Sequence, residues 1–142
     1  MDIVDALKED YRKFPKDQNF NLYAEDLYFK DPLNKFRGRA LFKLLINFMS
    51  IFFLDCVFDV HQIQRRGDEI RTDWTLSWTT PLPWKPRIHI PGWSELKVNA
   101  EELIVSQIDY WRCSRLDLLK QHFPWFYKQS VLDEKHPTHP DV

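Results

Sequence analysis

The chain has 142 residues, a net charge of −1 and only three glycines. This length can form one domain with a hydrophobic core that needs no disulfide or metal. The near-neutral charge argues against binding nucleic acid, which needs a concentrated basic surface. The scarcity of glycine argues against a glycine-rich phosphate loop. Aromatic residues are plentiful, with six tryptophans, and such residues supply both core volume and the walls of apolar pockets.

The N-terminal sequence carries no signal of secretion, because Met1 leads directly into a charged amphipathic segment. The most apolar run, residues 40–53, is too short to span a bilayer. The two cysteines, Cys56 and Cys113, lack a C-x-x-C spacing, so we expect both to be reduced. We therefore expect a cytoplasmic protein that does not insert into membranes.

Two helices are predicted in the first part of the chain. Apolar residues recur at helical spacing over residues 2–14, and Asp2 is suited to cap that helix. Residues 39–53 predict a second helix that is apolar over most of its circumference, so we expect it to be buried on more than one face. Between the helices we expect a helical turn at 22–26 and a short strand at 27–29.

A strictly alternating segment, residues 69–79, is the central feature of the second half. One face of this segment carries Ile70, Thr72, Trp74, Leu76 and Trp78, and the other carries Arg71, Asp73, Thr75 and Ser77. A period of two with β-branched and aromatic residues predicts a strand with two distinct faces. We expect it to pair with residues 57–65 through a hairpin turn at Gly67.

Two more strands and a helix complete the predicted order of elements. Residues 87–98 predict a third strand, with a bulge or kink at Pro91 and Gly92. Residues 103–112 predict the last strand. Ser114 is suited to cap a final helix over residues 114–126. Helices before and after a run of antiparallel strands predict an α+β fold, with the helices packed on one face of a curved sheet.

Two segments of the sequence, one before the predicted strands of the second half and one in the last of them, resemble a known superfamily. Residues 22–32, read L-Y-A-E-D-L-Y-F-K-D-P, and the later Gly38 resemble the opening of SnoaL-like proteins, which belong to the nuclear transport factor 2-like, or cystatin-like, superfamily. Residues 108–112, read I-D-Y-W-R, resemble that group's last strand. The segments 83–86 and 91–96 are similar to an uncharacterised SnoaL-like domain family of cyanobacteria and plants.

This resemblance implies a conical α+β fold. A strongly curved antiparallel sheet would wrap around the N-terminal helices, leave a pocket at its open end and be followed by a C-terminal helix. We expect a single domain over residues 1–127 and a flexible polar tail over residues 128–142. The superfamily includes isomerases, dehydratases, epoxide hydrolases, polyketide cyclases and non-catalytic binding or dimerisation modules, so the fold does not select a reaction.

The candidate catalytic residues are Arg71, Asp73 and Asp109. Two carboxylates beside an arginine can divide the roles of acid and base. The set resembles that of limonene epoxide hydrolase, in which an R-x-D strand and an aspartate of a W-R-D-Y-F-D strand activate water. The tyrosine and asparagine of that enzyme have no match near residues 29–31, and Arg112 stands where related sequences usually have aspartate. The alternative, which we favour, is an ion-pair cluster on the outer surface of the sheet.

An apolar ligand pocket is the second candidate site. Its expected lining residues are Tyr28, Phe48, Trp74, Trp78, Trp93, Tyr110 and Trp111. Aromatic walls with few polar groups are typical of sites for small hydrophobic ligands. The same residues could instead form a solid aromatic core without a cavity, and the sequence leaves both possibilities open.

The remaining candidates are isolated residues. His61 and His89 lie in predicted strands and could act as bases or ligands, and Tyr23 or Tyr28 could donate to a developing oxyanion. Packing is the commoner role for each of these residue types. The two histidines of the tail lack partners at a fixed spacing, so we expect neither a metal site nor a cofactor.

These patterns predict a SnoaL-like domain that binds a small hydrophobic molecule. One alternative is a cofactor-independent isomerase, cyclase or hydrolase that uses Asp73 and Asp109 with Arg71. Another is an interaction module that forms a homodimer through the outer face of the sheet. The face of the sheet that lines the cavity decides whether the charged residues can act on a ligand.

Overall fold

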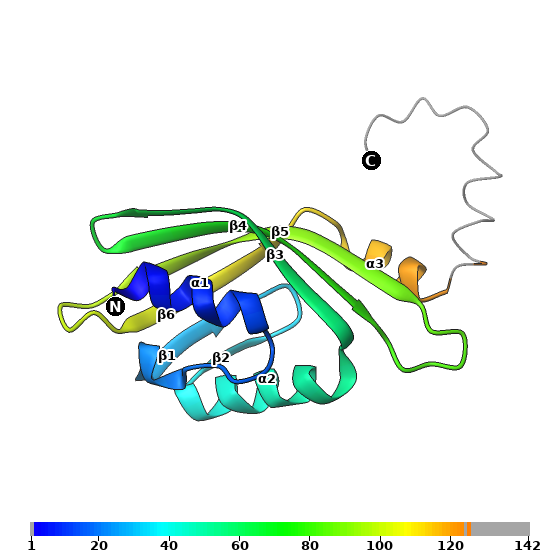
Figure 1. Cartoon of the computed structure of the whole chain (residues 1–142), viewed down its shortest axis with the longest axis horizontal. Helices are drawn as coiled ribbons and strands as arrows, with labels where there is room; N and C mark the ends of the chain where they lie inside the picture. The colour runs from blue at the N-terminus through cyan, green and yellow to red at the C-terminus, as the bar shows by residue number, and fades with distance from the viewer. Residues whose placement is uncertain (1, 124, 126–142) are drawn as a thin grey trace.

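The computed structural model describes residues 2–123 and 125. The elements are α1 (Ile3–Lys13), the 3-10 helix η1 (Phe20–Leu22), β1 (Tyr23–Lys30), β2 (Lys35–Arg37), α2 (Arg39–Phe52), β3 (Leu54–Arg66), β4 (Glu69–Thr79), β5 (Arg87–Val98), β6 (Ile104–Trp111) and α3 (Arg115–His122). The six strands form one sheet in the order β2-β1-β6-β5-β4-β3, and α1 and α2 lie on the same side of it (Figure 1). This α+β architecture confirms the predicted fold class, while the predicted tail, 128–142, lies outside the described residues.

The residues predicted to cap two helices and to form the hairpin turn have these roles in the structure. The side chain of Asp2 caps α1 by accepting from the backbone N–H of Asp5. Ser114 caps α3 and forms a reciprocal capping box with Asp117. Gly67 connects β3 to β4 with a φ of 62°, a conformation that glycine adopts without steric cost.

The predicted helical turn at 22–26 is wrong, because most of that segment belongs to β1. This strand pairs with β2 in antiparallel fashion on one side and with β6 in parallel fashion on the other. The sheet is therefore mixed rather than purely antiparallel. The local residues Ala24, Glu25 and Asp26 favour helix over strand, but pairing with two neighbours satisfies the backbone of β1 and overrides that preference.

The predicted bulge at Pro91 and Gly92 is also wrong. Strand β5 runs through both residues, and Gly92 pairs in register with Trp74 of β4. A β-carbon on Gly92 would lie 2.8 Å from Cη2 of Trp74 and against the backbone carbonyl oxygen of Tyr110. Glycine is therefore required here because the indole ring and a neighbouring strand approach the backbone closely.

Helix α2 is less buried than its apolar sequence predicts. Only Phe42 and Ile46 are buried, whereas Leu44, Phe48 and Ile51 are 64%, 51% and 66% exposed. One side of the helix packs on β1, where the ring of Phe42 contacts aromatic rings of that strand. The rest borders a cavity or solvent. Within the described residues, no helix is long and apolar enough to cross a membrane.

Replacing Gly92 with alanine should destabilise the fold, because the added methyl group must displace either the ring of Trp74 or the backbone of β6. We expect Gly92→Ala to lower the free energy of unfolding, measured by urea denaturation, by about 1–3 kcal/mol. Gly67→Ala is the matched control, since a β-carbon there meets nothing within 4 Å and the substitution introduces only backbone strain. A smaller loss of unfolding free energy for Gly92→Ala than for Gly67→Ala would contradict the requirement for glycine at position 92.

Candidate functional site

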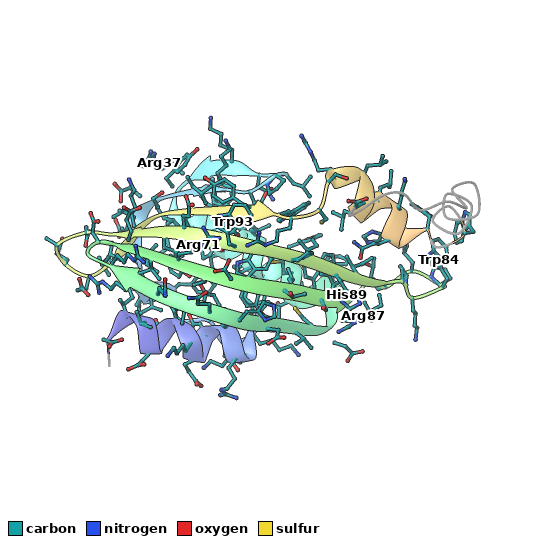
Figure 2. All side chains as sticks on the ribbon, turned by 90° about the horizontal axis from the view of Figure 1, so that it is seen from above. Arg37, Arg71, Trp84, Arg87, His89 and Trp93 are labelled. Atoms are coloured by element: carbon teal, nitrogen blue, oxygen red, sulfur yellow. The ribbon has the colours of Figure 1, made fainter. Side chains whose placement is uncertain are left out.

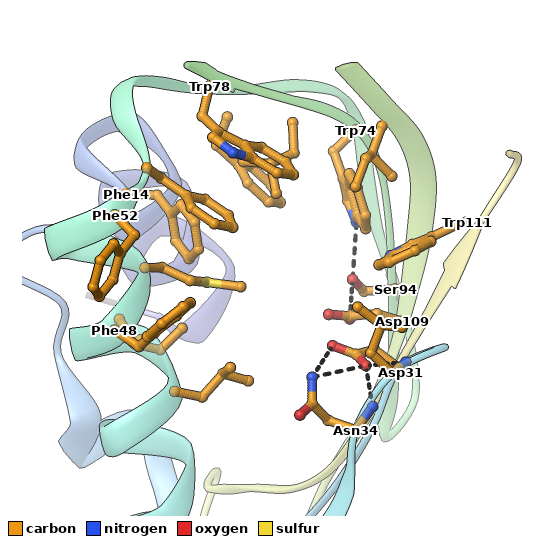
Figure 3. Close-up of a pocket in the computed structure, with 18 of the residues that line it drawn as sticks. Phe14, Asp31, Asn34, Phe48, Phe52, Trp74, Trp78, Ser94, Asp109 and Trp111 are labelled. Atoms are coloured by element: carbon orange, nitrogen blue, oxygen red, sulfur yellow. Dashed lines mark hydrogen bonds between the residues drawn. The ribbon is translucent and has the colours of Figure 1, made fainter. Parts of the chain in front are cut away.

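A cavity of about 540 Å³ lies between the inner face of the sheet and the helices. Its walls are mostly aromatic and aliphatic. Trp74 and Trp78 reach it from β4, Phe48 and Phe52 from α2, and Trp111 from the end of β6 (Figure 3). The inner face of the predicted central strand is thus the one that lines the cavity, and a solid aromatic core is not what the structure contains.

Four of the seven expected pocket residues line this cavity, namely Phe48, Trp74, Trp78 and Trp111. The other three do not. Trp93 and Tyr110 are paired residues of β5 and β6 whose rings stack on the outer face, with centroids 4.9 Å apart. The ring of Tyr28 lies under the guanidinium of Arg37, 5.4 Å from it.

The three predicted catalytic residues do not form one site. Arg71 and Asp73 lie on the outer face, where the carboxylate of Asp73 accepts from Arg71 and Arg112 at 3.1 Å each. Both guanidinium groups also lie over the ring of Trp93, at 5.1 and 4.6 Å from its centroid. Arg71 and Trp93 are labelled in Figure 2. The hydrogen bond from Arg71 lowers the pKa of Asp73. Asp109 lies on the inner face and lines the cavity.

A row of hydrogen bonds fixes Asp109 on the cavity wall. The indole N–H of Trp74 donates to the hydroxyl of Ser94 at 2.9 Å, and that hydroxyl donates to Oδ1 of Asp109 at 2.6 Å. The amide Nε2 of Gln107 donates to the same carboxylate oxygen at 3.1 Å. These residues belong to three adjacent strands, so the row crosses β4, β5 and β6 (Figure 3). The carboxyl group is consequently held in one orientation.

The electrostatics of the cavity make Asp109 an acid that titrates near neutrality. Burial raises its pKa from the usual 3.8 to about 7, although the hydrogen bonds from Ser94 and Gln107 oppose the shift. The carboxylate of Asp31 raises it further by repulsion. No lysine or arginine is among the lining residues, so no fixed cation in the described part of the chain counters these effects.

Asp31 and Asn34 add polar groups beside Asp109. They lie in the turn between β1 and β2, where Oδ1 of Asp31 accepts from the backbone N–H groups of Leu33 and Asn34 at 2.8 and 2.6 Å. The side-chain amide of Asn34 donates to the same carboxylate at 3.1 Å. Both residues line the cavity. No functional role was predicted for Asp31 or Asn34 from the sequence.

A second polar group reaches the cavity from α3. The indole N–H of Trp78 donates to the hydroxyl of Thr80 at 2.9 Å, and this hydroxyl lies 2.8 Å from Nε2 of His122. Nδ1 of His122 lies 2.9 Å from the carbonyl oxygen of Leu118. A carbonyl only accepts, so in the neutral imidazole Nδ1 carries the proton and Nε2 accepts from Thr80. No sequence signal marked His122 as a lining residue.

The other histidines that sequence reasoning considered lie away from the cavity. His61 contacts the hydroxyl of Thr75 at 2.8 Å, and His89 contacts that of Ser77 at 2.8 Å, both on the outer face. The tail histidines, 136 and 139, lie outside the described residues.

Tyr23, Cys56 and Cys113 are the remaining candidates from the sequence. Tyr23 is buried and lines the cavity. Cys56 and Cys113 are free and half-buried. Burial raises the pKa of Cys56 to about 11, which disfavours the nucleophilic thiolate.

Residues 1–107 match the model of a protein family described as uncharacterized conserved protein (DUF2358). This match ends two residues before Asp109. No curated protein matches the sequence.

Solved structures similar to this chain share its fold at low sequence identity. A hypothetical protein with a ketosteroid isomerase-like fold from Catenulispora acidiphila, in complex with trimethylamine, has a TM-score of 0.68 and 19% identity over 84% of this chain and 90% of its own. A "putative SnoaL-like polyketide cyclase" from Shewanella denitrificans has a TM-score of 0.64 and 20% identity over 83% and 97%. The epoxide hydrolase/cyclase-like enzyme SalBIII is described as having a role in pyran ring formation in the polyether salinomycin. It has a TM-score of 0.67 and 17% identity over 80% of this chain and 92% of its own. These likenesses show that the chain shares the fold of these proteins.

The raised pKa of Asp109 predicts how stability depends on pH. Between about pH 4 and pH 7 the folded chain keeps a proton on this carboxyl and the unfolded chain does not, so the free energy of unfolding falls as pH rises through this range. Asp109→Asn keeps an acceptor for Ser94 and removes the charge. We expect the variant to be about 1–4 kcal/mol more stable than the wild type at pH 8 and equally stable below pH 4.

Asp73→Asn is the matched control, because the pKa of Asp73 is lowered rather than raised. Chemical denaturation at several pH values should show this variant losing stability relative to the wild type above pH 4. If the free energy of unfolding at pH 8 changes in the same direction for both variants, Asp109 does not titrate as a buried carboxyl.

Proposed function

Since the chain belongs to the DUF2358 family of uncharacterized conserved proteins, a membership that specifies no activity, we propose from the cavity itself that the protein binds a small hydrophobic molecule. The cavity volume of about 540 Å³ carries this proposal. It lies within the range of roughly 300–1,000 Å³ that is usual for sites of small organic ligands. The fold is also that of proteins whose descriptions include isomerase-like and cyclase-like members, which supports a pocket for an organic ligand.

The walls of the cavity are held in place rather than free to collapse. The indole of Trp74 is fixed by Ser94, and that of Trp78 is fixed by Thr80 and stacks on Phe53 at 3.9 Å between centroids. Apolar side chains around an unfilled volume lose dispersion contacts, which lowers stability. A ligand that fills the volume restores those contacts without rearranging the walls, and such preorganisation favours binding.

Filling the cavity with a side chain should abolish binding of an apolar probe. Met49 of α2 lines the cavity, whereas Leu41 of the same helix is 47% exposed and does not. We expect wild-type protein to bind the neutral dye Nile red, measured as a rise in dye fluorescence. Met49→Trp should weaken this binding by about tenfold or more, since the larger ring occupies the ligand volume.

Leu41→Trp is the matched control and should bind the dye as the wild type does. Far-UV circular dichroism of both variants checks that the fold is retained. Failure of the wild type to bind, or equal binding by a folded Met49→Trp variant, would refute the proposed pocket.

Acid–base catalysis in this cavity is a second candidate function, and the position of Asp109 favours it. A carboxyl whose pKa is about 7 can take or give a proton near neutral pH, and general acid–base catalysis is most efficient under that condition. Such a group suits a cofactor-independent isomerase, cyclase or hydrolase. Arg71 and Asp73 would not take part, because they lie on the other face of the sheet. Turnover of an enolisable ketone or an epoxide that Asp109→Asn abolishes would support this function.

Homodimer formation through the outer sheet face stays a prediction. That face presents the stacked rings of Trp93 and Tyr110, with the guanidinium groups of Arg71 and Arg112 over the ring of Trp93. A concentration-dependent mass in analytical ultracentrifugation, lost in Trp93→Ala, would support it. Membership of a cyanobacterial and plant group likewise stays a prediction.

A further inference from the structure

We propose that the cavity selects apolar ligands that carry a hydrogen-bond donor, above all a protonated amine, and discriminates against carboxylates. This inference rests on the proposed function, because it names the ligand class of the same cavity. It follows from the carboxyl groups and the unpaired acceptor on the wall around Asp109, and from the lack of lysine and arginine among the described lining residues.

The wall has more acceptors than donors. Oδ1 of Asp109 accepts the hydrogen bonds from both Ser94 and Gln107, which leaves Oδ2 without one in the described structure. Gln107 is only 9% exposed, and its Oε1 has no hydrogen-bond partner among the described residues. Nε2 of Gln107 donates to Asp109, and at pH 8 the ionised carboxylate of Asp109 only accepts, so Oε1 is the free acceptor end of the amide. Unpaired buried acceptors are unfavourable, and a ligand with a donor at this wall relieves that cost.

Two donors beside Asp109 are already engaged and are not available to an anionic ligand. The N–H of Trp74 and the hydroxyl proton of Ser94 are both used within the row. Arg71 of β4 and Arg112, which follows β6, bind Asp73 on the opposite face of the sheet.

Charge and aromatic surface at this wall favour a cation. Asp31 lies close enough to Asp109 to raise its pKa by repulsion, so two carboxyl groups share this end of the cavity. The indole rings of Trp74 and Trp111 lie beside the row in Figure 3, and aromatic rings attract ammonium groups. His122 is the one histidine among the described lining residues, and Thr80 and Leu118 engage both its nitrogens. A ligand carboxylate would therefore meet repulsion without a compensating cation.

Three ligands with the same aromatic ring test this selectivity: 1-naphthylmethylamine, 1-naphthalenemethanol and 1-naphthoate, titrated into the full chain at pH 8 by isothermal calorimetry. We expect the amine to bind at least about tenfold more tightly than the alcohol, and the carboxylate at least about tenfold more weakly. Asp109→Asn should reduce the affinity for the amine to that for the alcohol. Asp73→Asn, on the outer face, should leave all three affinities unchanged.

The outcomes separate this inference from the proposed function. If the alcohol binds but the amine binds no more tightly, or if the carboxylate binds best, the selectivity is refuted while the pocket stands. If none of the three ligands and no Nile red binds, both proposals fail. The ranking of ligands on the wild type decides the question even if a variant fails to fold.

The pH dependence of amine binding gives an independent readout. The ionisable groups around Asp109 are Asp31 at the end of β1, Tyr11 of α1 and Tyr23 of β1. Burial raises the pKa of both tyrosines, so they stay neutral from pH 5.5 to pH 8. The advantage of the amine over the alcohol should therefore shrink as pH falls to 5.5 and Asp109 gains its proton. An advantage that stays constant over this range would overturn the role of Asp109.

Discussion

The hydrogen-bonded row from Trp74 through Ser94 to Asp109 is the interaction on which the cavity depends. It crosses three strands and joins an aromatic wall to an acidic group. The indole can lie over β5 only because Gly92 has no β-carbon. The polar edge of Trp74 is thus satisfied within the sheet, and its apolar ring borders the cavity. One set of contacts both shapes the apolar surface and orients the acid.

The alternation of side chains along the strands keeps two kinds of chemistry apart. Arg71 and Asp73 differ by odd steps from Trp74 and therefore belong to the outer face, where they form an exposed ion-pair cluster with Arg112. Asp109 belongs to the inner face. Because the sheet separates the two groups, the arginines do not lower the pKa of Asp109. Its raised pKa results from burial in the cavity and from repulsion by Asp31.

The faces of β4 and the caps at Asp2 and Ser114 could be predicted, because strand alternation and capping are encoded in neighbouring residues. The face of Asp109 could not, since Tyr110 and Trp111 are both aromatic and give β6 no clear alternation. Its partners Ser94 and Gln107 are brought together by the register of β5 with β6. His122 reaches the cavity because α3 docks on β5, where Gln121 pairs with the backbone of His89. Such contacts between distant segments leave no local pattern in the sequence.

The proposed ligand chemistry depends most directly on the protonation of Asp109. The carboxyl carbon of this residue can be followed by ¹³C NMR as a function of pH, with Asp109→Asn used to assign the signal. We predict a titration midpoint near 7, as burial in the cavity requires. Addition of 1-naphthylmethylamine should move the midpoint to lower pH, because a bound cation stabilises the carboxylate. The proposed ligand selectivity requires Asp109 to be a buried acid without a cationic partner. A midpoint near the usual 3.8 in the free protein would contradict this requirement.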